Sequence, residues 1–269
     1  MLFEFMKRCN KTMFRRKRSW LFCKMWPVTH YLVTNFFVTL WYLFFKLLNR
    51  TVIVGKKNIP HRGNTLLLSN HQSMVDSFLV GTFAFYPQSL FNPCLLPWNP
   101  AAEENFYKNP IVSWFADNWK CIPIKKGRKD VGALFRMAEA LKESPMVLFP
   151  EGTRSRDGSI GRPRGGAGLL ILESKPTVIP VCITGMDKVL PIGSIIPRIF
   201  KRIYVYYGKP VDLSEFYGEE KSKAVARAIM TKVMDRIRSM RMEIEELSAH
   251  KNLSLEKELN AKGLMHPSK

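Results

Sequence analysis

TLLLSNHQSMVD, residues 65–76, joins a short apolar run to a polar segment. An apolar run that ends in Ser and Asn is typical of a buried strand leaving its sheet into a loop. Catalytic side chains usually lie on such loops. We therefore expect a strand at residues 65–69, a helix at residues 76–86, and His71 in the loop between them.

His71 and Asp76 are five residues apart, a spacing that would rotate the two side chains away from each other on a regular helix. A turn, in contrast, can fold the carboxylate back onto the imidazole. A carboxylate bonded to one ring nitrogen leaves the other free as a general base. The pair is thus a candidate catalytic dyad for a substrate that brings its own hydroxyl. The alternative is an ordinary loop histidine, with Asp76 only capping the next helix.

A second apolar run, residues 146–149, ends in PEGTRSRDG, residues 150–158. Glu151 would lie at the tip of this strand, and Gly152 would let the backbone approach a ligand closely. Hydroxyl and guanidinium donors suited to a phosphate follow at Thr153, Arg154, Ser155 and Arg156. The alternative is a surface turn that carries solvated charges, which residues 156–158 taken alone would favour.

The two segments together resemble the glycerolipid acyltransferases that acylate lysophosphatidic acid and related lysophospholipids. The signature of that family is a His, four residues and an Asp, followed downstream by a Phe-Pro-Glu-Gly block, which here is residues 149–152. The similarity extends from about Val52 to about Pro210. It implies His71 and Asp76 as catalytic residues, and as substrate-binding residues Asn70, Lys125, Lys126, Glu151, Gly152, Thr153 and Arg154.

The resemblance also implies the partners of the reaction. The acceptor would be a lysophospholipid and the donor acyl-CoA or an acyl carrier protein, with no metal and no other cofactor. The expected reaction converts lysophosphatidic acid to phosphatidic acid in phospholipid biosynthesis. His71 would deprotonate the acceptor hydroxyl, and Arg154 with Lys125 or Lys126 would hold its phosphate.

The sequence departs from the family's pattern at two places. Lys125 or Lys126 stands where the family has an arginine, and Ala102 stands where many lysophosphatidic acid acyltransferases have a lysine. The blocks at residues 98–103, 120–124 and 185–191 are more similar to the tafazzin branch, phospholipid transacylases that remodel cardiolipin. A tafazzin-like transacylase, or an acyltransferase for another lysolipid, is therefore the alternative function.

Two further classes of protein are compatible with parts of the sequence. A hydrolase could use the same histidine and aspartate on water or a serine, but the chain has no Gly-x-Ser-x-Gly elbow. A non-catalytic, basic protein that binds membranes or nucleic acid would leave the coincidence of the two motifs unexplained.

The formal net charge of +20 predicts an anionic partner surface, which charge alone does not assign to lipid or to nucleic acid. Five cysteines are scattered without a Cys-x-x-Cys spacing. This pattern favours reduced thiols facing the cytosol and argues against a zinc site or a disulfide scaffold.

The composition of residues 1–50 favours a lipid surface over nucleic acid as the anionic partner. Basic and aromatic residues are interleaved up to Trp26, and residues 28–45 are nearly free of charge. About twenty apolar residues suffice to cross a bilayer. Because basic residues flank this segment on both sides, we expect a hairpin that bends at Trp26-Pro27 and dips into one leaflet, with a full span as the alternative. The protein would be membrane-associated, with its active site facing the cytoplasm.

Strands that alternate with helices predict an α/β fold with a mainly parallel central sheet flanked by helices. We expect three regions: a membrane-anchoring segment at 1–50, an α/β acyltransferase domain at 51–218, and a C-terminal amphipathic helix with a polar tail at 219–269. The prolines at 87–100 predict irregular structure, and Pro110 predicts the start or the kink of a helix.

Overall fold

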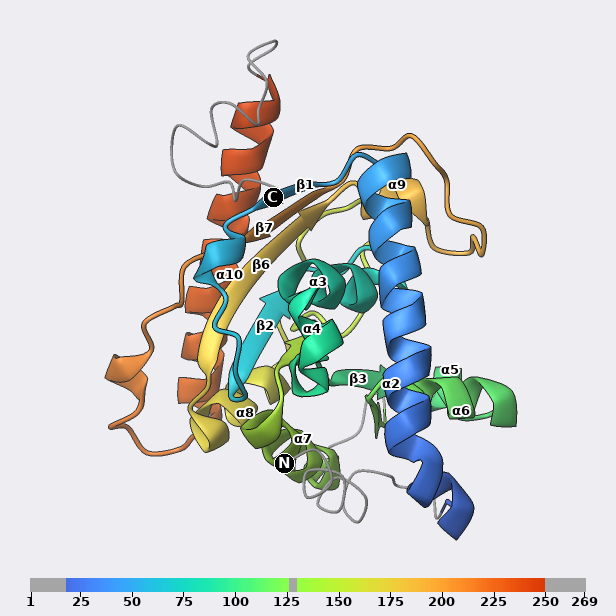
Figure 1. Ribbon diagram of the computed structural model, residues 1–269. Helices are drawn as coiled ribbons and strands as arrows, with labels where there is room; N and C mark the ends of the chain where they lie inside the picture. Colours follow the sequence, from blue (N-terminus) through green and yellow to red (C-terminus); the bar gives the residue numbers. More distant parts are fainter. Residues whose placement is uncertain (1–17, 126–129, 250–269) are drawn as a thin grey trace.

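The computed structural model describes residues 18–125 and 130–249 (Figure 1). The predictions for Lys126, for the basic residues before Arg18 and for the tail after Ala249 lie outside the described residues.

In the described part of the chain, five strands form the central sheet in the order β1-β7-β6-β2-β5. β2 pairs in parallel with β5 and β6, β1 pairs in parallel with β7, and β6 and β7 are antiparallel. The predicted mainly parallel sheet is thus confirmed. The carboxyl ends of β2, β5 and β6 consequently meet at one edge. The bounds are β1 Val52–Val54, β2 Thr65–Ser69, β5 Met146–Leu148, β6 Thr177–Thr184 and β7 Tyr204–Tyr207.

A second, two-stranded parallel sheet extends this arrangement beyond β5. It consists of β3 (Asn99–Ala102) and β4 (Cys121–Ile124). The backbone of Trp98 joins it to β5, since Trp98 N donates to Pro145 O at 2.9 Å and Val147 N donates to Trp98 O at 2.9 Å. The sequence did not predict β3, because Pro97 and Pro100 flank and interrupt it. β4 confirms the strand expected there.

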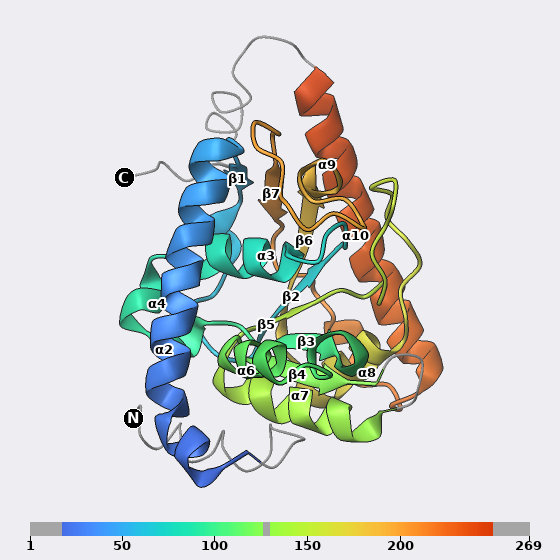
Figure 2. The same ribbon diagram turned by 90° about the vertical axis from the view of Figure 1, so that its right-hand side faces the viewer.

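Helices cover both faces of the central sheet (Figures 1 and 2). Along β2, Leu66 and Leu68 face a core shared with α7, α8 and α10, whereas Leu67 faces a core shared with α3 and α9. The predicted C-terminal helix, α10, therefore completes the core of the α/β domain. The bounds are α3 Asp76–Phe85, α7 Val131–Glu143, α8 Gly166–Ser174, α9 Met186–Val189 and α10 Lys223–Ala249.

Several shorter elements connect these layers. Asn109 caps α6 through its side chain, and Pro110 is the first residue of that helix, so the predicted start at Pro110 is confirmed. The remaining bounds are α4 Gln88–Phe91, α5 Glu103–Phe106, α6 Pro110–Asn118, and the 3₁₀ turns Lys56–Asn58, Pro93–Leu95 and Ser214–Phe216.

The long helix α2 (Trp20–Leu43), with a π-helical turn at Phe44–Leu48, runs along one side of the molecule (Figure 1). The helix is continuous through Pro27, so the predicted bend at Trp26-Pro27 is wrong. Proline removes one backbone hydrogen bond, but tertiary packing compensates. The Trp26 side chain is buried, and its Nε1 donates to Asp117 O at 3.0 Å.

α2 buries the polar side chains of His30, Thr34 and Asn35 together with Trp26 and Val38, whereas many of its apolar side chains are exposed. Its inner face packs on α3 and α6, where Thr34 Oγ1 donates to Asn118 O at 2.7 Å. Trp20–Leu48 is long and apolar enough to cross a membrane, and only 22% of its most apolar window is buried. The outer face exposes Leu21, Met25, Val28, Leu32, Phe36, Leu40, Leu43 and Leu47. This face makes α2 a candidate membrane segment, and its pattern is the reverse of that of a soluble amphipathic helix.

α8 and α10 pack closely against each other because residue 168, at their contact, is a glycine. A Cβ atom at Gly168 would lie 2.1 Å from the carbonyl oxygen of Ala226. We predict that Gly168→Ala lowers the free energy of unfolding by about 1–3 kcal/mol, because backbone must move to relieve the overlap. Gly166→Ala, where nothing lies within 4 Å, is the matched control and should leave stability unchanged or raise it. Thermal unfolding of the purified variants measures both, and equal melting temperatures would contradict the prediction.

Candidate active site

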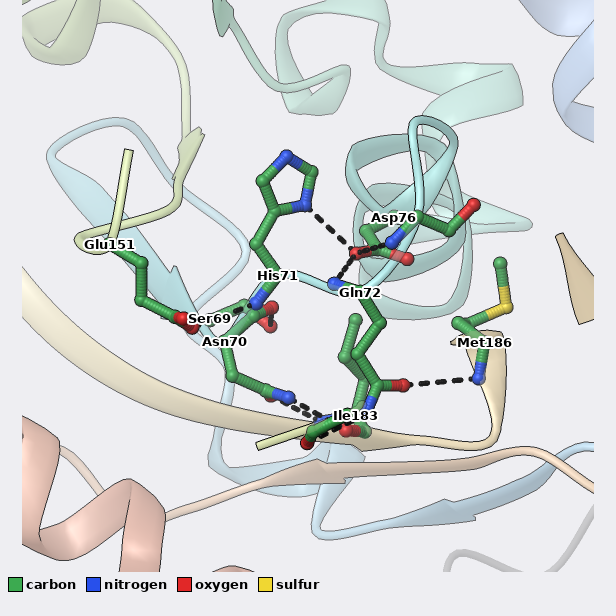
Figure 3. Close-up of polar contacts among 10 residues, drawn as sticks. Ser69, Asn70, His71, Gln72, Asp76, Glu151, Ile183 and Met186 are labelled. Carbon is green, nitrogen blue, oxygen red and sulfur yellow. Dashed lines mark hydrogen bonds and ion pairs between the residues drawn. The ribbon is translucent and has the colours of Figure 1, made fainter. Parts of the chain in front are cut away.

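The loops after β2, β5 and β6 converge at one edge of the sheet, as parallel pairing requires. They deliver His71, Glu151 and Met186 respectively (Figure 3). His71 and Glu151 thus emerge at the same edge, as the mainly parallel sheet expected from the sequence implies.

The imidazole of His71 is held by Asp76. His71 Nδ1 donates to Asp76 Oδ2 at 2.9 Å, and the same oxygen accepts the backbone N–H groups of Gln72 at 2.6 Å and Ser73 at 2.7 Å. Asp76 is fully buried and is the first residue of α3, where the helix dipole favours a negative charge. The carboxylate is thereby fixed in position. It in turn fixes the ring and selects the tautomer with the proton on Nδ1.

The other ring nitrogen of His71 is available. It points away from Asp76 in Figure 3, and no hydrogen bond joins it to the described residues. The ring stacks on Phe149, with centroids 4.0 Å apart and an interplanar angle of 14°. The His71 side chain is 18% exposed. Nε2 is thus an oriented base that a ligand can reach.

Glu151 joins the first two loops. Its Oε1 accepts from His71 N at 3.0 Å and its Oε2 accepts from Gly161 N at 2.9 Å. Burial raises the pKa of this carboxyl, while the two N–H donors act in the opposite direction. With both oxygens bound to backbone N–H groups, Glu151 positions the His71 loop, and its expected contact with the substrate stays a prediction.

Asn70 has a similar role. Its Nδ2 donates to Ile183 O at 2.9 Å and its Oδ1 accepts from Ile183 N at 2.8 Å, so the side chain extends the pairing between β2 and β6. The residue is fully buried. The side-chain amide thus positions the start of the His71 loop against β6, and the expected contact of Asn70 with the substrate stays a prediction.

Sequence reasoning missed Gln72. This side chain is 2% exposed, accepts from Met186 N at 3.1 Å and donates through Nε2 to Gly158 O at 3.3 Å. It thereby ties the His71 loop to the other two loops (Figure 3). The position of Gln72 directly after His71 was a sequence signal for this role. It does not suffice, because a glutamine in a loop is ordinarily exposed to solvent.

The remaining predicted substrate residues line the same edge. Gly152 has a φ of 65°, a conformation that favours glycine, and the side chain of Arg164 lies within 3 Å of where a Cβ would be. Thr153 is exposed and Arg154 half-buried. Ser155 N donates to His71 O at 2.8 Å, which fastens this loop beside the histidine. Lys125 is exposed directly after β4. β4 continues the parallel array, which puts Lys125 at the same edge of the molecule.

Residues 18–125 and 130–249 contain no group of three or more His, Cys, Asp or Glu side chains that could hold a metal ion. The arrangement at this edge is therefore an oriented, accessible histidine beside a loop of hydroxyl and guanidinium donors.

Comparison with known proteins agrees with this class of site. The profile of the Acyltransferase family matches residues 50–184, half of the chain. The chain therefore belongs to the acyltransferase family, and the family resemblance expected from the sequence is confirmed. The matched segment contains β1 to β6 and hence His71, Asp76 and Glu151.

Individual relatives lie in two branches. The chain is 29% identical over 193 residues to a chloroplastic 1-acyl-sn-glycerol-3-phosphate acyltransferase of Brassica napus, covering 66% of this chain and 52% of that protein. It is 29% identical over 212 residues to tafazzin of Drosophila melanogaster, covering 73% of this chain and 53% of tafazzin. The chain thus spans about half the length of both relatives.

A solved structure shares the fold. The crystal structure of the 1-acyl-sn-glycerophosphate (LPA) acyltransferase PlsC from Thermotoga maritima superposes with a TM-score of 0.54 at 22% sequence identity. The match covers 88% of this chain and 93% of that one. The expected fold class is confirmed by this similarity.

The bridging role of Glu151 can be tested by Glu151→Gln. An amide can accept from only one of the two backbone N–H groups and turns its own N–H₂ toward the other. We predict a loss of about 1–3 kcal/mol in the free energy of unfolding. Glu139→Gln, which removes an exposed ion pair with Lys142, should change stability by less than about 1 kcal/mol. Chemical denaturation measures both variants. Equal stability of the two would refute the bridge.

Proposed function

We propose that this protein transfers a fatty acyl chain from a thioester donor to the free hydroxyl of a lysophospholipid. The acceptor is lysophosphatidic acid and the product is phosphatidic acid, so the reaction belongs to phospholipid biosynthesis. The observation that carries the proposal is the His71–Asp76 pair with Nε2 directed away from the carboxylate. Family membership and the name of the Brassica napus relative support the choice of acceptor.

The reaction proceeds by direct transfer. Nε2 of His71 removes the proton of the acceptor hydroxyl, and Asp76 stabilises the imidazolium that forms. The hydroxyl oxygen attacks the thioester carbonyl, an ester bond forms, and the carbon–sulfur bond breaks. The leaving thiolate takes the proton from His71. No covalent acyl-enzyme is needed, because the acceptor supplies the nucleophile.

Arg154 and Lys125 bind the acceptor phosphate in this proposal. Arg154 lies on the loop that Ser155 fastens to the backbone of His71, so phosphate binding positions the hydroxyl near Nε2. Such positioning can supply a large part of the rate acceleration. Gly152 and Thr153 complete the loop, and Lys126 adds charge beside Lys125. No metal or further cofactor takes part, so we expect full activity in the presence of a chelator.

A second candidate function is tafazzin-like transacylation between a phospholipid donor and a lysophospholipid. Two observations favour it: the match to Drosophila tafazzin covers 73% of the chain, and Ala102 stands where many lysophosphatidic acid acyltransferases have a lysine. The identity of the donor separates the two functions.

We also propose that residues 1–50 attach the protein to a membrane and that the site faces the cytoplasm. The apolar outer face of α2 supports attachment. Basic residues on both sides of the apolar segment, including Lys24 and Arg50, favour a monotopic arrangement. Residues 51–218 form the acyltransferase domain in this proposal, and the helical part of 219–269 packs onto its core.

His71→Ala tests the proposed base. With acyl-CoA and lysophosphatidic acid, we predict that kcat falls by about a hundredfold or more, since general base catalysis contributes that much. Asp76→Asn should lower kcat by about tenfold or more, because the amide no longer selects the Nδ1–H tautomer. Phosphatidic acid formation by the purified protein is the measurement.

The same assay with diacyl phospholipid in place of acyl-CoA decides between the two functions. Transfer from the phospholipid alone would favour the transacylase. Unchanged transfer by His71→Ala from either donor would refute the proposed base, and release of free fatty acid without transfer would indicate a hydrolase.

Arg154→Lys tests phosphate binding. A lysine keeps the charge but loses the planar fork, so we predict that the KM for lysophosphatidic acid rises about tenfold while the KM for acyl-CoA is unchanged. Arg156→Lys, an exposed arginine two residues further along the loop, is the control and should leave both constants near wild type. The same KM for both variants would contradict a contact between Arg154 and the phosphate.

A further inference from the structure

The loop between α9 and β7 exposes an unusual set of apolar side chains. Ile195 is 87% exposed and Ile196 is 74% exposed, although neither lies in a helix or strand. Three more apolar residues of the same loop, which we call the 192–200 loop, are exposed: Ile192, Ile199 and Phe200. A cluster of this kind on a soluble surface marks an interaction site.

The loop is held in this conformation at its carboxyl end. Arg198 N donates to Val189 O at 2.7 Å, and Phe200 N donates to Leu48 O at 2.9 Å. Lys201 N donates to Asn49 Oδ1 at 3.2 Å. Phe200 has a φ of 60°, a conformation that is unfavourable for an aromatic residue. These hydrogen bonds therefore hold the loop in its exposed conformation, despite the backbone strain at Phe200 and the unfavourable hydration of the apolar side chains.

The 192–200 loop continues the apolar surface of α2. The bond from Phe200 to Leu48 joins it to the end of the π-helical turn, where Leu47 is 67% exposed. In Figure 1 the loop lies beside the upper end of α2, on the right of the molecule, and Figure 2 turns that side toward the viewer. α6 lies at the opposite end of α2 on this side, and its Ile111 is 69% exposed.

The charge of the loop fits a lipid surface. Residues 188–211 contain no Asp or Glu. Arg198, Lys201 and Arg202 are exposed around the isoleucines. Apolar side chains surrounded by cations match the hydrocarbon and the anionic headgroups of a bilayer, whereas a nucleic acid would leave the isoleucines in water.

We propose that the 192–200 loop is a second membrane contact, separate from the N-terminal segment, which inserts Ile195 and Ile196 into an anionic bilayer. The proposal rests on the membrane location in the proposed function and does not depend on acyl transfer. Through α9 and the bond from Met186 N to Gln72, the loop is connected to the catalytic loop. Its insertion therefore sets the distance between His71 and the lipid surface.

The depth of residue 196 in a lipid bilayer tests the proposed insertion. The full chain, with Cys9, Cys23 and Cys94 replaced by serine, carries an environment-sensitive fluorophore at Ile196→Cys and is reconstituted into phosphatidylcholine–phosphatidylglycerol vesicles. We predict a blue shift, quenching by lipid-attached nitroxide and loss of quenching by aqueous iodide. The control position is Met242→Cys on α10, an exposed apolar residue outside the 192–200 loop, which should keep its quenching by iodide.

Equal quenching of positions 196 and 242 by iodide, with no quenching by the lipid nitroxide, would overturn the proposal. Protection of residue 196 from iodide without quenching by the lipid nitroxide would also overturn it, and would point to a protein partner or a second copy of this chain. The same label in His71→Ala should report the same depth. Failure of the proposed chemistry and failure of this proposal are thus distinguishable.

A kinetic readout separates membrane contact from a structural role. We predict that Ile195→Ser combined with Ile196→Ser raises the KM for acceptor presented in vesicles by about a hundredfold, since the burial of each isoleucine in hydrocarbon is worth about tenfold. The kcat with a short-chain, water-soluble acceptor should be unchanged. An unchanged KM for the vesicle-borne acceptor would also contradict the proposal.

Discussion

One carboxylate oxygen, Oδ2 of Asp76, organises this site. It accepts hydrogen bonds from the imidazole of His71 and from the backbone N–H groups of Gln72 and Ser73. The turn at residues 71–76 and the orientation of the ring are therefore set by the same atom. Because Asp76 is also the first residue of α3, a core helix fixes that atom in space. The proposed base is therefore already oriented in the free protein, which would lower the cost of reaching a reactive geometry.

The three loops at this edge are joined by side chains that bind backbone. Glu151 links the His71 loop to Gly161, and Gln72 links it to Gly158 and Met186. α10 supports the same loop from outside, since Arg241 donates to Gly158 O. The carboxylate of Glu151 and the amide of Gln72 thus hold the loops together, whereas Thr153 and Lys125 remain exposed at this edge.

The sequence predicted the parts of this site that follow from strand ends. A run such as residues 65–68 followed by Ser and Asn shows where a strand stops, and parallel pairing brings the ends of β2 and β5 together. It did not predict the roles of Asn70 and Gln72, whose partners lie more than 80 residues away. Local pattern carries no information on such partners. The bend predicted at Trp26-Pro27 is absent, and residues 99–100, within the segment 87–100 that was predicted to be irregular, belong to β3. Both differences have a related cause, because buried contacts of Trp26 and Trp98 outweigh the preferences of proline.

In the proposed mechanism His71 activates the acceptor, and the acyl chain moves directly between the two substrates. Rapid mixing of the enzyme with acyl-CoA alone, followed by measurement of free coenzyme A, distinguishes direct transfer from an acyl-enzyme. We expect no burst of thiol until lysophosphatidic acid is added, and then thiol and phosphatidic acid released in equal amounts. A burst of thiol equal to the enzyme concentration, without acceptor, would demonstrate an acyl-enzyme and rule out direct transfer.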